Sequence, residues 1–304
     1  MTAADFEILD ERFRRLVRMS ARAQRLYGDC RWAEGPAYFP AHRGLIWSDV
    51  PNNRMLRFDE ETQAVSVFRR PSNYSNGNTV DRIGRLVTCE QGTRRVTRTE
   101  HDGSITVLAD RVRDARFNSP NDVVVKSDGS VWFTDPTYGI DSNYEGLQAP
   151  SELDGCHVYR IDPSDGGVTQ VTHDFVRPNG LAFSPDEKRL YIADSGATHR
   201  KDGPRHIRVF NVNSDSTLSG GEVFAACTAG LFDGFRIDES GRLWTSAIDG
   251  VHCYEPNGDL IGKILIPEPV ANVVFGDEKR NRLFICATTS LYSVYVAVNG
   301  AKTF

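Results

Sequence analysis

The 304-residue sequence predicts an all-β fold, a six-bladed β-propeller with four-stranded antiparallel blades, on three observations. One pattern occurs six times along the chain. The first five occurrences are each followed by enough residues for four short strands. The spacing of the pattern is typical of a propeller rather than of the two domains that about 150 residues per domain would suggest. We therefore expect a single propeller domain over residues 1–304.

The repeated pattern is a polar residue, a short apolar run, a turn with Asp or Gly, and a strand that starts with an apolar pair. It covers residues 34–50, 76–91, 121–136, 179–196, 233–249 and 272–288. The strand starts are 40 residues apart between Trp47 and Val87, but 59 apart between Trp132 and Tyr191. Spacing this variable does not suit a solenoid of identical turns and indicates blades whose loops carry insertions.

The third repeat illustrates how each unit accommodates four strands. Short runs rich in β-branched and aromatic residues occur at 122–126, 131–135, 157–161 and 168–173. Turn signals such as Asp128-Gly129 separate these runs, which predicts consecutive antiparallel hairpins.

The sixth repeat lacks a fourth strand, because its third strand, at 291–298, is followed only by the end of the chain at Phe304. A ring must close to remove the unpaired edges of its first and last blades. We expect residues 24–30, within a segment spanning 23–31, to supply the missing strand. The preceding extension, 1–22, has Phe13, Leu16 and Val17 at helical spacing, which predicts a short helix over 10–18 outside the ring.

The first residue of each repeat carries a side-chain oxygen. The six residues are Glu34, Asn76, Asn121, Asn179, Asp233 and Asn272. Innermost strands run beside the axis of a propeller, so these positions should form a ring, although Asn and Asp are depleted in strands. Asn-Gly and Asp-Gly pairs also make turns, which is an alternative explanation for these residues. However, the six aligned positions do not share one turn sequence; they share only a side-chain oxygen.

A ring of carboxylate and amide oxygens without Cys or His suits a hard divalent cation. Ca²⁺ is the first expectation, with Mg²⁺, Mn²⁺ or Zn²⁺ as alternatives. Two long connections, 136–156 and 195–205, should return to the same end of the ring and form a rim or lid. Their contacting side chains would be Tyr138, Tyr144 and His199; the alternative is exposed loops without function.

Composition and motifs exclude several classes of protein. The formal charge of −5 argues against binding nucleic acid or an anionic membrane. The acidic N-terminus does not resemble a signal peptide, and no stretch of 18 apolar residues occurs, so a cytoplasmic protein is expected. The six cysteines are scattered and are interpreted as free thiols. Serine-hydrolase, zinc-protease and nucleotide-binding motifs are absent, and Ser195 is interpreted as a strand end.

Five stretches resemble the gluconolactonase branch of the senescence marker protein (regucalcin), gluconolactonase and luciferin-regenerating enzyme-like family. They are CRWAEGP at 30–36, WSDVPNNR at 47–54, FNSPND at 117–122, PNGLAFSPD at 178–186 and FDG at 232–234. The resemblance extends over nearly the whole chain and implies a six-bladed propeller. One departure is Gln91, where many bacterial relatives have His, so the preferred sugar acid stays open.

The resemblance implies that four members of the ring bind the metal. These ligands are Glu34, Asn121, Asn179 and Asp233. Asp233 is assigned as general base, with Glu34 as the second catalytic carboxylate and chiefly a ligand. Substrate contacts are assigned to Asn76, Asn118, Tyr138 and Asn272.

The implied reaction is metal-dependent opening of a sugar-acid lactone, such as D-glucono-1,5-lactone, to the aldonic acid. The cation would polarise the lactone carbonyl as a Lewis acid while water attacks. A carboxylate bound to a dication is a weaker base, so a metal-bound hydroxide remains an alternative to Asp233. Other lactones, phosphotriesters and a non-catalytic binding propeller also remain open, as does the oligomeric state.

Overall fold

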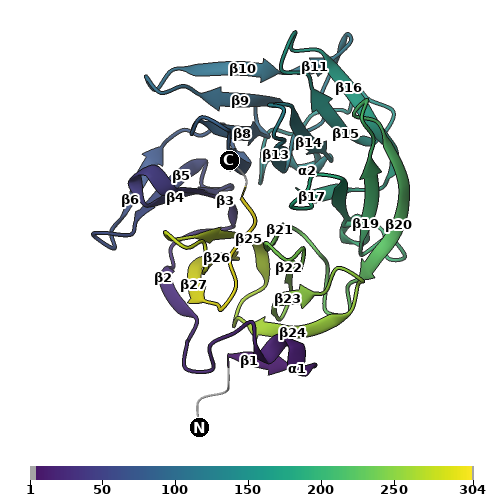
Figure 1. Cartoon of the computed structure of the whole chain (residues 1–304). Coiled ribbons are helices and arrows are strands. Elements are labelled where there is room, and N and C mark those ends of the chain that lie inside the picture. Colours follow the sequence, from purple (N-terminus) through teal and green to yellow (C-terminus); the bar gives the residue numbers. More distant parts are fainter. Residues whose placement is uncertain (1–4, 303–304) are drawn as a thin grey trace.

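The structure is a computed structural model that describes residues 5–302. Six small antiparallel sheets surround a central channel, which is the predicted six-bladed β-propeller (Figure 1). The first strand of each sheet lies at the channel and contacts the first strand of the neighbouring sheets. No helix in the described part of the chain is long and apolar enough to cross a membrane.

Each blade is built from strands that follow one another along the chain. Blade one contains β3 (Ala33–Phe39), β4 (Gly44–Asp49), β5 (Arg54–Asp59) and β6 (Val65–Arg69). Blade two contains β7 (Ser75–Val80), β8 (Leu86–Glu90), β9 (Arg95–Thr99) and β10 (Ile105–Ala109). Blade three contains β13 (Val123–Val125), β14 (Val131–Asp135), β15 (Cys156–Ile161) and β16 (Val168–Phe175).

The other three blades continue in the same order. Blade four contains β17 (Pro178–Phe183), β18 (Arg189–Asp194), β19 (His206–Val212) and β20 (Leu218–Ala226). Blade five contains β21 (Phe235–Ile237), β22 (Leu243–Ala247), β23 (Gly250–Tyr254) and β24 (Leu260–Leu265). Blade six contains β25 (Val270–Gly276), β26 (Arg282–Ala287) and β27 (Ser290–Tyr295).

Short elements lie outside the blades. A two-stranded ribbon of β11 (Arg111–Val112) and β12 (Ala115–Arg116) links blades two and three. The long loop after β14 contains α2 (Tyr138–Asp141), and the loop after β18 contains the 3₁₀ turn η2 (Gly196–Thr198). A second 3₁₀ turn, η1 (Pro40–His42), connects β3 and β4.

The ring closes through β2 (Gln24–Tyr27), which pairs antiparallel with β27 as the fourth strand of blade six. This confirms the predicted closure by an N-terminal strand. The regular strand ends at Tyr27, earlier than expected, although the Cys30 backbone N–H still donates to the Thr289 carbonyl at 3.0 Å. Pairing with β2 covers the edge that β27 would otherwise leave open.

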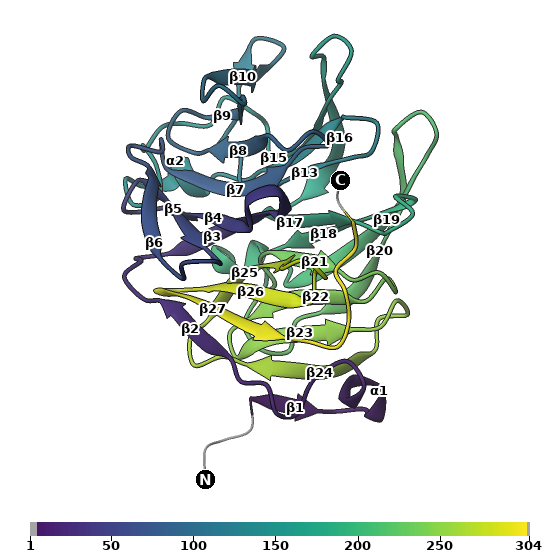
Figure 2. The same ribbon diagram turned by 60° about the vertical axis from the view of Figure 1, so that its left-hand side comes forward.

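The N-terminal extension differs from the prediction in two ways. β1 (Phe6–Ile8) adds an unexpected fifth strand to blade five by pairing with β24. The helix α1 is a single turn, Glu11–Arg14, rather than 10–18. It ends early because Val17 joins Val296 of blade six in a backbone bridge, which requires extended geometry. Figure 2 shows β1 and α1 lying along the outer edge of blade five.

Phe13 anchors this extension to the propeller. Its ring is fully buried, 5.9 Å from the Trp244 ring of β22. Gly262 of β24 provides the space, since a Cβ there would lie 2.1 Å from the Phe13 ring. The helical-spacing triplet Phe13, Leu16 and Val17 thus packs into the core shared by blades five and six.

We expect Phe13→Ala to lower the free energy of unfolding by about 3 kcal/mol or more, because it leaves a cavity between the extension and Trp244. Chemical denaturation measures the change. Leu9→Ala, an exposed position in the same segment, is the control and should change it by less than about 0.5 kcal/mol. Equal effects of the two substitutions would show that the extension is not anchored in this way.

Candidate active site

A cavity of about 390 Å³ opens at the end of the channel where the inner strands begin. Its walls include five of the six predicted ring residues, together with residues of the two long loops. The polar and titratable lining residues are Glu34, Asn76, Asn121, Tyr138, Glu145, Asn179, Ser195, Thr198, His199 and Asp233. The structure therefore brings the four predicted metal ligands to one place.

Glycine determines how closely the inner strands approach one another. Gly180, after Asn179, donates its N–H to the Asp233 carbonyl at 3.2 Å, and a Cβ there would lie 2.2 Å from that oxygen. Gly77, after Asn76, likewise donates to the Asn121 carbonyl at 2.7 Å. These Asn-Gly pairs are sites of backbone contact between blades, rather than only turns into a strand.

Glu34, at the start of β3, is buried and held from two sides. Its Oε2 accepts hydrogen bonds from the Gly35 backbone N–H at 2.8 Å and from the Asn272 amide at 3.2 Å. Because Asn272 belongs to β25, the last blade orients a carboxylate of the first. Burial raises the pKa of Glu34, and the nearby Asp122 raises it further.

Asp233 lies two residues before β21 and keeps part of its surface open to the cavity. Its backbone N–H donates to Ser246 Oγ at 2.8 Å. Low-dielectric surroundings raise the pKa of Asp233, and repulsion from Glu34 adds to this. Within residues 5–302, no Lys or Arg forms an ion pair with either carboxylate, so a cation would relieve their repulsion.

Asn179 presents an oxygen without a hydrogen-bond partner. Its amide Nδ2 donates to Ser195 Oγ at 3.2 Å, and that hydroxyl donates to the Phe232 carbonyl at 2.6 Å. The remaining amide oxygen is buried and has no partner among the described residues. A buried acceptor costs free energy unless something donates or coordinates to it, so this atom fits a metal ligand.

The donor set fits a hard cation rather than a soft one. It consists of the carboxylates of Glu34 and Asp233 and the amides of Asn121 and Asn179. No group of three His, Cys, Asp or Glu suited to a metal occurs in the part of the chain that the structure describes. Such a set of oxygen ligands suits Ca²⁺ or Mg²⁺ better than it suits a metal that prefers thiolate or imidazole ligands.

The predicted substrate contacts divide into two groups. Asn76 and Tyr138 line the cavity, whereas Asn118 and Asn272 do not. Asn272 contacts Glu34 instead, and its Oδ1 accepts from the Val273 N–H at 2.9 Å. Asn118 is fully buried and donates to the carbonyls of Asp135 and Gly155, so it fastens the base of the long loop after β14.

The two long loops meet across the cavity, as expected for a rim. The Tyr138 hydroxyl lies 3.2 Å from Thr198 Oγ1, and the Tyr138 and His199 rings are 5.6 Å apart. Arg177 packs over the Tyr138 ring at 5.2 Å and pairs with Asp141 at 2.7 Å. Tyr144 is exposed and does not line the cavity.

Sequence reasoning missed three polar residues of the site, which are Glu145, Ser195 and Thr198. Glu145 lies in the loop after β14, and burial raises its pKa. No repeat position marks it, because it belongs to an insertion. Ser195 does follow β18, as interpreted, but its hydroxyl also orients Asn179. Gln91 is fully buried beside Gly139 and does not line the cavity.

The sequence pattern of the family described as SMP-30/Gluconolactonase/LRE-like region matches residues 32–289. The chain belongs to this family. It is 31% identical to the gluconolactonase of Zymomonas mobilis over 303 residues, which cover 92% of this chain and 82% of that protein. It is 30% identical to the pentonolactonase XacC of Haloferax volcanii, over 84% of this chain and 81% of that protein.

A solved structure is also similar to this chain in both sequence and fold. The gluconolactonase of Xanthomonas campestris is 36% identical and has a TM-score of 0.90, covering 96% of this chain and 94% of that chain. The resemblance inferred from the five sequence stretches is thereby confirmed.

Because the pKa of Asp233 is raised in the folded protein, the folded state holds a proton on this carboxylate that the unfolded state releases. This proton binding stabilises the fold at low pH, and the stabilisation is lost as pH rises through the raised pKa. In chelator, Asp233→Asn should therefore be more stable than the wild type at pH 8 by about 1 kcal/mol, with a smaller difference near pH 5. Urea unfolding at the two pH values measures this. Asp202→Asn, at an exposed loop position, should show no such pH-dependent gain; a pH-independent difference for Asp233→Asn would contradict the prediction.

Proposed function

We propose that this protein is a metal-dependent hydrolase that opens sugar-acid lactones, with D-glucono-1,5-lactone or a close relative as substrate. Its membership of the SMP-30/gluconolactonase family and its lactonase relatives support lactone hydrolysis. The observation that carries the metal dependence is that the carboxylates of Glu34 and Asp233 share one cavity with the unpartnered Asn179 oxygen.

Glu34, Asn121, Asn179 and Asp233 would hold the cation, with Ca²⁺ as first choice and Mg²⁺, Mn²⁺ or Zn²⁺ as alternatives. When bound, a divalent cation supplies Lewis-acid polarisation of the lactone carbonyl. Asn272 fixes the orientation of Glu34, and the pair of Ser195 and the Phe232 carbonyl fixes that of Asn179. These contacts hold the ligand oxygens in place before substrate arrives.

Asp233 is proposed to take the proton from the attacking water. Both ring carboxylates line the cavity, but Asp233 is only partly buried, whereas Glu34 is buried and accepts two hydrogen bonds at Oε2. A general base must lie within hydrogen-bond reach of the proton that it abstracts. The more exposed carboxylate of Asp233 meets this condition better than that of Glu34. Glu34 then serves chiefly as a ligand.

The rest of the cavity suits a small, polyhydroxylated ring. Asn76, Tyr138, Glu145 and His199 supply polar groups around it, while Ile248 and Val270 supply an apolar wall. A few placed polar groups on an apolar lining are typical of a small-molecule site. The relatives include both a gluconolactonase and a pentonolactonase, so six-carbon and five-carbon lactones belong in one substrate panel with phosphotriesters.

Removal of metal should abolish lactone opening, and restoration should recover it. Protein treated with chelator and verified metal-free by elemental analysis is supplied with Ca²⁺, Mg²⁺, Mn²⁺ or Zn²⁺ singly. Opening of D-glucono-1,5-lactone is followed against its spontaneous hydrolysis. Full activity in the verified metal-free protein would disprove the proposed metal dependence.

Asp233→Asn should lower kcat by about a hundredfold or more, the contribution typical of a general base. Stability and metal content are measured alongside, because the substitution also changes a proposed ligand. Asp202→Asn is the matched control, and its kcat should equal that of the wild type. Near-normal kcat in metal-loaded Asp233→Asn would remove Asp233 from the role of base.

A further inference from the structure

A second cavity, of about 100 Å³, lies at the opposite end of the channel from the candidate active site. Residues from the later parts of all six inner strands line it, and Ala301 and Lys302 of the C-terminal segment pass over it. Ala301 is held there by its N–H, which donates to the Ile237 carbonyl at 3.0 Å. This cavity therefore has walls contributed by every blade.

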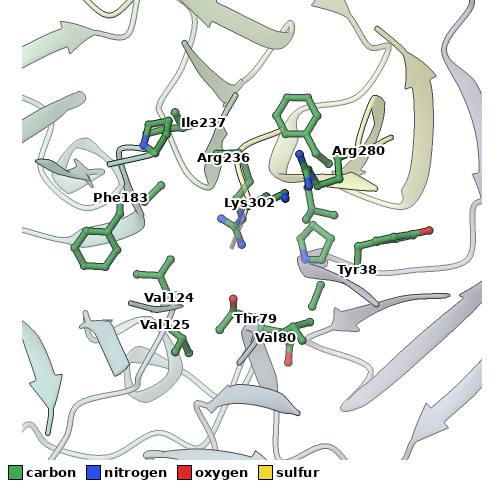
Figure 3. Close-up of a pocket in the computed structure, with 18 of the residues that line it drawn as sticks. Tyr38, Thr79, Val80, Val124, Val125, Phe183, Arg236, Ile237, Arg280 and Lys302 are labelled. Carbon is green, nitrogen blue, oxygen red and sulfur yellow. The ribbon is translucent and has the colours of Figure 1, made fainter. Parts of the chain in front are cut away.

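Positive charge gathers at this second cavity. Four cationic side chains line it against a single carboxylate, Glu187, in the described chain; the cations are Arg82, Arg236, Arg280 and Lys302. Figure 3 shows Arg236 and Lys302 near the middle of the opening. The excess is local, since the whole protein has a formal charge of −5 and the cavity at the other end contains Glu34, Glu145 and Asp233.

Two of the four cations are paired with carboxylates, Arg82 with Glu187 and Arg280 with Glu239, so the available positive charge comes mainly from Arg236 and Lys302. Arg236 donates to the Phe235 carbonyl at 2.8 Å, and its nearest carboxylate, Asp122, lies 3.9 Å away. Arg82 pairs with Glu187 at 2.6 Å, but its Nε is buried without a partner among the described residues. No ion pair within residues 5–302 involves Lys302.

Apolar side chains surround these cations. Val124 and Val125 of β13, Phe183 of β17 and Ile237 of β21 form the walls (Figure 3). Walls of this kind lower the local dielectric constant, which strengthens the attraction between an anion and Arg236. Guanidinium groups also bind carboxylate and phosphate in a bidentate way.

We propose that this cavity is a second ligand site, which binds a small organic anion through its carboxylate or phosphate group at Arg236. Lys302 lies over the opening and adds a second positive charge to the same group. The apolar walls contact the body of the ligand. The site is distinct from the proposed lactone site, which occupies the other end of the channel.

Isothermal titration calorimetry of the full chain at low ionic strength tests the proposal with three probes: gluconate, hexanoate and inorganic phosphate. We expect at least one to bind with Kd of about 1 mM or lower. If gluconate binds most strongly, the ligand is a sugar acid. If hexanoate binds most strongly, it is an apolar carboxylic acid, and if phosphate does, the ligand is recognised by a phosphate group. Failure of all three to bind would overturn the proposal.

Two substitutions locate the binding. Arg236→Gln should weaken it at least tenfold, with thermal unfolding used to verify the fold. Lys302→Glu changes a terminal position outside the blades and should also weaken binding at least tenfold. Lys279→Glu, an exposed position with the same change of charge, should bind as the wild type does. Unchanged binding in both Arg236→Gln and Lys302→Glu would overturn the proposal.

A final variant separates the two ends of the channel. Asp233→Ala alters the candidate active site and should leave binding of the probe unchanged. Binding lost in Asp233→Ala but kept in Lys302→Glu would place the anion in the active site and overturn the proposal. Because the titration requires no lactone turnover, its outcome is independent of the proposed hydrolase activity.

Discussion

Direct backbone contact between neighbouring inner strands is the constraint on which the rest of this structure depends. Gly77 of blade two donates to Asn121 beside blade three, and Gly234 of blade five donates to Ala271 of blade six, both at 2.7 Å. Such contacts require glycine, because a Cβ at Gly77 would lie 2.4 Å from the Asn121 oxygen. The residue that precedes the glycine is thereby held at the channel mouth, which is how Asn76 and Asp233 reach one cavity.

The site also depends on how the ring closes. Asn272 in blade six donates to Glu34 in blade one, so the junction between the last and first blades runs through the candidate active site. Blade six is completed by β2, and the extension before β2 is fixed by Phe13 against Trp244. The N-terminal residues therefore support the position of a site carboxylate that they do not touch.

Charge is distributed unequally along the channel. Glu34 and Asp233 face one cavity, where burial raises both pKa values; repulsion from Asp122 raises that of Glu34 further, and repulsion from Glu34 raises that of Asp233 further. Arg236 and Lys302 face the other cavity, and Asp122 lies between the two ends, 3.9 Å from Arg236. This separation of the two signs of charge suits the proposed cation at one end of the channel and the proposed anion at the other.

The sequence by itself determined the repeat, the six blades, the closing strand and the ring of oxygen-bearing residues, because each depends on local pattern or on one repeated position. Only the tertiary structure placed Glu145 in the cavity, turned Asn118 and Asn272 away from it, and shortened the helix to α1 so that Val17 pairs with Val296. It also brought Arg82, Arg236, Arg280 and Lys302 to one mouth of the channel. These features arise from contacts between residues far apart in the chain and from loops outside the repeat, where no periodic pattern indicates which side chains meet.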